Sequence, residues 1–171
     1  AMNRPGGKLA LFWLEYLASL KENQSSEWTG LPEPVKVLFR EVSQGHSDDS
    51  RLARLVLVSQ LHYLFFLDRE FGMEVFIPLL DWSRDTTCAA QCWQGFLGWG
   101  QWKTSFLQLI LPLYQQTLPH LSEFAPLATD AFARDVATIA VFGSENTCAD
   151  SWLYRCMEAL NTGLLRELDK K

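Results

Sequence analysis

The stretch Leu9–Glu22 reads LALFWLEYLASLKE and sets the fold class. Its apolar residues recur three or four positions apart, which is the period of an amphipathic helix. The charged residues Lys8, Glu15, Lys21 and Glu22 oppose them. We therefore expect a first helix that buries one stripe of six residues: Leu9, Phe12, Trp13, Tyr16, Leu17 and Leu20.

The same spacing continues along the chain, and no run of strict alternation predicts a strand. Further helices are predicted near residues 34–42, 50–67, 75–80, 86–98, 102–117, 129–143 and 150–160. A polar break is expected at 68–72, and Asp85 is expected to be the N-cap of the helix near 86–98. The chain is thus predicted to be all-α, with about eight helices. An irregular helical bundle and a short α-solenoid both stay open, because none of the known helical repeat signatures is present.

Composition favours one globular domain over residues 1–171. The 171 residues are 48% hydrophobic and carry a net charge of −5. A chain of this length buries enough surface for a single core without disulfides or metal. The acidic balance argues against nucleic-acid binding, which needs Lys and Arg. The uncharged run 104–122 is not a membrane span, because Pro112, several glutamines and His120 interrupt it.

The cysteines predict a reducing compartment. Cys88 and Cys92 are four residues apart and Cys148 and Cys156 eight, unlike the closely spaced pairs of zinc sites. All four are interpreted as small core residues. If their segment is helical, Cys88 and Cys92 lie on one face of the helix, where a disulfide between them would be strained. The first residues lack a secretory signal, so we expect a cytoplasmic protein. Ala before Met at the start fits a piece cut from a longer chain, and it also fits a full-length protein.

The most unusual segment is residues 85–121, in which only Asp85 and Lys103 are charged among thirty-seven residues. Such helices are either central in the core or covered by another surface. Tryptophans gather there around glycines, either to fill a helical hairpin or to line a groove. The candidate interaction surface is Trp93, Trp99, Trp102, Phe96 and Tyr114.

Nothing in the sequence predicts a catalytic residue, a metal site or a cofactor. His46, His62 and His120 have no recognisable partner, and no zinc, calcium, di-iron or phosphate-loop motif is present. We therefore expect a non-catalytic interaction or regulatory domain. The alternative is a small helical ligand-binding or enzymatic domain with a Trp-lined pocket near His62.

Three segments, Leu80–Asp85, Ala89–Gly100 and Leu111–Tyr114, resemble an uncharacterised bacterial helical domain found C-terminal to sirtuin-like domains in anti-phage defence proteins. The resemblance covers about residues 79–120, and 132–142 looks like the next helix. It implies a neighbouring domain that consumes NAD and a helical part that regulates, oligomerises or senses. It carries no catalytic residue onto this chain. The expected partners are a protein or neighbouring domain, or a second copy docked through residues 85–121.

Overall fold

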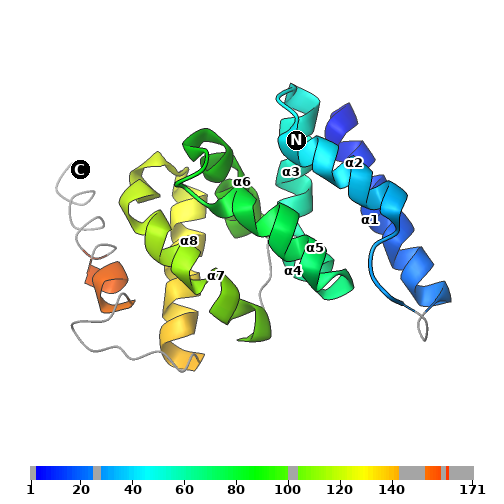
Figure 1. Cartoon of the computed structure of the whole chain (residues 1–171). Helices are drawn as coiled ribbons and strands as arrows, with labels where there is room; N and C mark the ends of the chain where they lie inside the picture. The colour runs from blue at the N-terminus through cyan, green and yellow to red at the C-terminus, as the bar shows by residue number, and fades with distance from the viewer. Residues whose placement is uncertain (1–2, 25–27, 100–103, 143–152, 159–160, 162–171) are drawn as a thin grey trace. The chain divides into compact units, whose positions relative to one another are not determined.

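The computed structural model describes residues 3–24, 28–99, 104–142, 153–158 and 161, and within them every regular element is a helix (Figure 1). The predicted all-α fold is confirmed. The chain groups into two compact units, residues 1–103 and 104–171, and each is described by itself. The single domain over 1–171 stays a prediction.

The first unit is built around α3 (Asp48–Ser59), which contacts α1 (Pro5–Asn23), α2 (Glu33–Gln44), α4 (Leu61–Leu67) and α6 (Thr86–Trp99). Figure 1 shows α3 between α1 and α6. Three short turns connect α4 to α6: α5 (Arg69–Phe71), a π-helical turn (Gly72–Phe76) and a 3-10 turn (Ile77–Leu80). The predicted N-cap of α6 is confirmed, because Asp85 Oδ1 accepts the Cys88 amide at 2.9 Å.

The second unit contains α7 (Thr104–Thr117), a 3-10 turn (Leu118–Glu123) and α8 (Pro126–Phe142), and residues 153–158 are also helical. The buried Tyr114 joins α7 to α8. Its hydroxyl donates to Asp135 Oδ2 at 2.6 Å, and its ring lies 5.3 Å from that of Phe132. Burial, reinforced by the Asp135 carboxylate, raises the pKa of Tyr114 well above its usual range. Tyr114 is therefore a neutral packing residue.

The prediction for the buried face of α1 was wrong. The buried residues are Gly6, Gly7, Ala10, Leu14 and Leu17, so that only Leu17 of the predicted stripe is buried. Small residues let the α1 backbone approach α3 closely, and the Gly6 amide donates to Asp49 Oδ1 at 3.1 Å. Close backbone approach thus outweighed side-chain size in choosing the face: Leu9, Phe12 and Tyr16 are exposed, and Trp13 and Leu20 are half-buried.

The predicted long helix over 50–67 is also wrong, because it divides at Gln60. The Gln60 amide donates to the Leu57 carbonyl, three residues back, at 3.0 Å, and the residue leaves the helical region with φ −109° and ψ 22°. A new helix, α4, starts at Leu61. The predicted polar break at 68–72 instead holds α5, which Asp68 caps by accepting the Phe71 amide.

Asp68 joins three segments of the first unit. Its Oδ2 accepts the Leu31 amide at 3.1 Å and lies 2.7 Å from Lys36 Nζ, while Oδ1 accepts the Phe71 amide at 3.0 Å. Gly30 lies beside this carboxylate with φ +127°, a backbone conformation that favours glycine. Burial alone would raise the pKa of Asp68, but these three hydrogen bonds together lower it.

Replacing Gly6 tests whether close packing orients α1. In an exposed helix, Gly→Ala stabilises by about 1 kcal/mol. At Gly6 a new Cβ would collide with the Asp49 backbone carbonyl, so we expect Gly6→Ala to destabilise instead. Gly98→Ala is the matched control, because no atom of the described residues lies within 4 Å of that Cβ position. Urea unfolding of both variants measures the difference, and equal effects would contradict the packing argument.

Replacing Asp68 tests the carboxylate. We expect Asp68→Asn to lose roughly 2 to 4 kcal/mol at pH 7, because Lys36 and two amides lose an ionised acceptor. The folded-state pKa is lowered, so this stability is present above the unfolded value of about 4 and is lost as pH falls through the folded value. The difference in unfolding free energy between the wild type and Asp68→Asn should therefore shrink from neutral to acidic pH, and denaturant melts of both proteins measure it. A gap that persists in acid would contradict the role of the charge.

Candidate functional site

Three residues of the predicted interaction surface are buried: Trp93, Phe96 and Tyr114. Trp93 Nε1 donates to the Leu80 carbonyl at 2.9 Å, and its ring meets Phe96 edge-on at 5.7 Å. The prediction is therefore wrong for these three, which pack inside the chain. Trp102 and the side chain of Trp99 lie outside the described residues.

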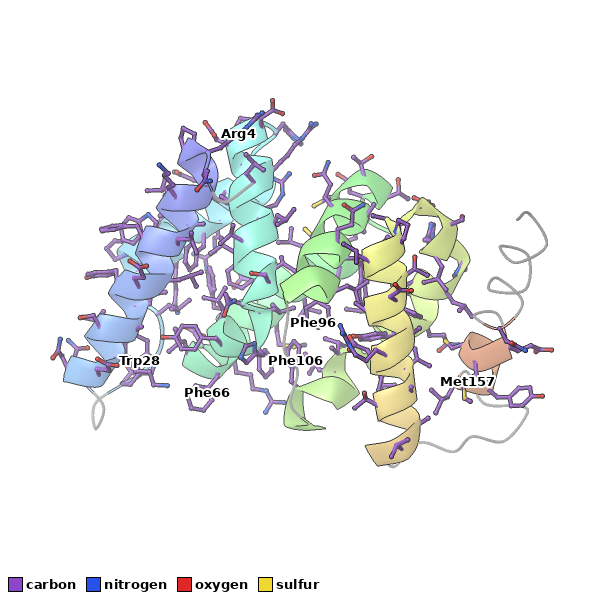
Figure 2. The ribbon with its side chains drawn as sticks, turned by 180° about the vertical axis from the view of Figure 1, so that it is seen from behind. Arg4, Trp28, Phe66, Phe96, Phe106 and Met157 are labelled. Atoms are coloured by element: carbon purple, nitrogen blue, oxygen red, sulfur yellow. The ribbon has the colours of Figure 1, made fainter. Side chains whose placement is uncertain are left out.

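A different apolar surface is exposed, on α1. Leu9, Phe12 and Tyr16 are 46%, 57% and 43% exposed. Trp13 meets both Phe12 and Tyr16 edge-on, at 5.6 and 5.7 Å between ring centroids. We call Leu9, Phe12, Trp13 and Tyr16 the aromatic face of α1. Figure 2 shows side chains projecting from α1 on the side away from α3.

Two charged residues flank the aromatic face, and the indole N–H of Trp13 within it is buried. Lys8 and Glu15, seven residues apart, are both exposed along one flank of it. Trp13 Nε1 is buried and finds no hydrogen-bond acceptor among the described residues. A buried donor without an acceptor costs about 1–3 kcal/mol, so this cluster is not optimised as a closed core.

A cavity of about 420 Å³ opens in the first unit, where the end of α2, α3, the two turns before α6 and the start of α6 meet. Most of the residues that line it carry polar side chains, and no tryptophan is among the described ones, so it does not match the predicted Trp-lined pocket. The chemically active groups that line it are Arg40, His46, Arg54, Glu74, Arg84 and Cys88.

Arg54 forms the inner wall of this cavity although it belongs to the buried side of α3. Its Nη1 donates to the carbonyls of Val42 at 3.1 Å and Ser43 at 3.4 Å, and also to that of Gly45. A cation at the carbonyl end of a helix is stabilised by the helix dipole. Arg54 therefore fixes the end of α2 and brings a positive charge into the cavity.

Cys88 and Cys92 are adjacent thiols on α6, with 3.9 Å between their sulfur atoms. Cys88 is half-buried and lines the cavity, whereas Cys92 is fully buried behind it. A hydrogen bond from the Cys92 thiol lowers the pKa of Cys88 to about 7; burial and Asp85 oppose this shift and Arg54 supports it. The same hydrogen bond and burial raise the pKa of Cys92.

Sequence reasoning placed Cys88 and Cys92 on one helical face but found no reactive thiol. It lacked the position of Arg54, thirty-four residues earlier in the chain, which reaches Cys88 only through the packing of α3 against α6. The sequence did contain one signal for this contact: Arg54 lies among apolar residues of a predicted helix, where a charged side chain needs a partner.

The histidines are dispersed. His46 lines the cavity, His62 is half-buried on α4, and His120 Nδ1 lies 2.6 Å from Glu123 Oε1. Within the described ranges, no three His, Cys, Asp or Glu side chains are grouped so as to hold a metal ion. Of the helices described, none combines the length and apolar character that crossing a membrane requires.

Comparisons with known proteins found no family model, no curated protein and no solved structure that matches the chain. The two candidate sites, the aromatic face of α1 and the Cys88 cavity, are therefore interpreted from their own geometry.

The titration of Cys88 can be measured by alkylation. Only the thiolate reacts with iodoacetamide, so we expect the Cys88 rate to rise with pH through a midpoint near its pKa of about 7 and then level off. The buried Cys156 is the internal control, because burial raises its pKa to about 11. Mass spectrometry of peptides across pH follows both thiols. A Cys88 midpoint near the ordinary value of about 8.5 would contradict the site geometry.

Proposed function

We propose that this chain is a non-catalytic helical interaction domain that docks a partner helix on the aromatic face of α1. The observation that carries the proposal is the exposure of Leu9, Phe12 and Tyr16 on a well-packed helix. Fully burying such a side chain is worth roughly 1.5–3 kcal/mol. These three are about half exposed, so a partner that covers them would recover part of that stabilisation. Anchors spaced three and four residues apart are typical of helix recognition.

The partner that the charges favour is α1 of a second copy. Lys8 and Glu15 occupy equivalent positions one heptad apart, on the same flank of the aromatic face. When two copies pair antiparallel with Phe12 near Phe12, Lys8 of each copy lies close to Glu15 of the other. A two-fold pairing thus satisfies both charges twice and joins the apolar surfaces.

The size of the contact favours a weak dimer. The 19 residues of α1 form a helix about 28 Å long. One such pair of helices lies at the small end of specific interfaces, below about 1,200 Å². Reversible association suits a regulatory domain. The free thiols Cys88, Cys92 and Cys156 support the cytoplasmic location that belongs to the same proposal.

A finer form of the proposal rests only on the resemblance of Leu80–Tyr114 to the bacterial defence domain. In this form the chain regulates a sirtuin-like, NAD-consuming neighbour. Adding the purified chain to a sirtuin-like defence protein that lacks its helical domain, and following NAD consumption, tests it. Consumption that the chain leaves unchanged contradicts this finer form and leaves the dimer untouched.

Charge exchange tests the dimer. We expect Lys8→Glu and Glu15→Lys each to weaken self-association by roughly 3- to 30-fold, since each removes two symmetric ion pairs of about 0.3–1 kcal/mol. The double variant restores the pairs and should regain association. Light scattering over a concentration series measures this.

Two further variants control for the apolar contact. Phe12→Glu should abolish the dimer, whereas Val37→Glu, at a comparably exposed apolar residue on α2, should leave it intact. A wild-type chain that stays monomeric at every concentration, or a double variant weaker than both single ones, would contradict pairing through α1.

A further inference from the structure

We propose that Cys88 and Cys92 form a dithiol exchange site in the cavity, and that its substrate is the disulfide of a small anionic thiol. The inference is independent of the interaction through α1. It rests on three features of the first unit: the 3.9 Å between the sulfur atoms, the difference in their burial, and the arginines around the cavity.

Burial fixes the order in which the two thiols react. Cys88 lines the cavity, so a dissolved disulfide can reach its sulfur atom. Cys92 is only 1% exposed and touches Cys88, so it can be reached only through Cys88. Cys88 is therefore the attacking thiol and Cys92 the resolving thiol.

The exchange proceeds in two balanced steps. The Cys88 thiolate attacks one sulfur of the substrate disulfide; a Cys88–sulfur bond forms, the substrate sulfur–sulfur bond breaks, and one thiolate leaves and takes a proton from water. Cys92 then gives its proton to water and attacks Cys88 Sγ, which forms the Cys88–Cys92 bond and expels the second thiolate. The protein loses two electrons and two protons, and the substrate becomes two thiols.

The first step also prepares the second. The negative charge on Cys88 is one of the causes that raise the pKa of Cys92. Once Cys88 is held in a mixed disulfide, that charge is gone and the Cys92 thiol ionises more readily. The two thiols therefore react in sequence.

The cavity suits an anionic ligand. Its volume of about 420 Å³ lies within the range of small-molecule sites. Three guanidinium groups line it beside the carboxylates of Glu74 and Asp85, and Arg40 also pairs with Glu33 at 3.6 Å. The arginines are therefore balanced by carboxylates, and a ligand anion would have to replace these partners. Arg40 and Arg84 form exposed ion pairs with Glu74 and Asp81, at 3.2 and 3.6 Å. Exposed pairs are weak, so both arginines can turn to a ligand carboxylate at little cost.

The position of the thiols on α6 makes the internal disulfide reversible. Residues four apart on a helix lie on one face, but closing their sulfur atoms to about 2 Å strains a regular helix. Cys88 lies in the first turn of α6, where the Asp85 side chain accepts its amide, and Cys92 lies one turn further into the helix. Strained disulfides are easily reduced, so the released thiol in excess returns the site to its dithiol form.

The test exposes the reduced full chain to oxidised glutathione, and peptide mass spectrometry follows each of the four cysteines separately. The wild type should pass through one glutathione on Cys88 and end with a Cys88–Cys92 link. Cys92→Ser should accumulate glutathione on Cys88, and Cys88→Ser should leave Cys92 unmodified. Cys156→Ser, which removes a buried thiol outside the cavity, should behave as the wild type. Modification of Cys92 in Cys88→Ser, or no preference for Cys88 over Cys156, would overturn the site.

The ligand class has its own test. The neutral disulfide of 2-mercaptoethanol reacts by the same chemistry without carboxylates. We expect Arg84→Gln to slow the reaction with oxidised glutathione by roughly 2- to 5-fold, the range of an exposed ion pair, and to leave the neutral disulfide unaffected. Equal effects on both disulfides would overturn the anionic class.

Discussion

The first unit depends on the close approach of α1 to α3. Gly6, Gly7 and Ala10 have small or no side chains, so the α1 backbone packs close to α3. The Gly6 amide donates a hydrogen bond to the Asp49 side chain. Because α1 packs against α3 through these small residues, helical geometry places Leu9, Phe12 and Tyr16 on the side of α1 that is not packed against α3. Exposure of the aromatic face is thus a consequence of how α1 is anchored, so the proposed interaction surface and the packing have one cause.

The opposite side of α3 works by the same principle. Gly95 of α6 lies against the Leu55 carbonyl, where a Cβ would come within 2.6 Å of the oxygen. The close contact sets α6 beside Arg54, whose guanidinium already holds the end of α2. The charge that acts on Cys88 therefore depends on the packing of α2 and α6 against α3. The cavity lies where α2 ends and α6 begins, with Cys88 in the first turn of α6.

The two proposed sites use different physical properties of one unit. The aromatic face offers apolar area with charges on its flank, which suits a partner helix. The cavity offers three arginines and one reachable sulfur, which would suit the proposed disulfide of a small anionic thiol. Neither site needs the other, because the first depends on exposure of α1 and the second on the burial order of two cysteines of α6.

The sequence by itself determined the all-α class, the first helix, the N-cap at Asp85 and the proximity of Cys88 to Cys92, because helical period and capping depend on neighbouring residues. Only the tertiary structure decided which face of α1 is buried, that the predicted helix over 50–67 divides at Gln60, that Trp93, Phe96 and Tyr114 lie inside, and that Arg54 reaches Cys88. Hydrophobic periodicity identifies the helix face with the most apolar side chains as the buried one. It does not take into account that glycines let two helices pack more closely and therefore more favourably. Contacts between residues far apart in the chain leave no local pattern from which to predict them.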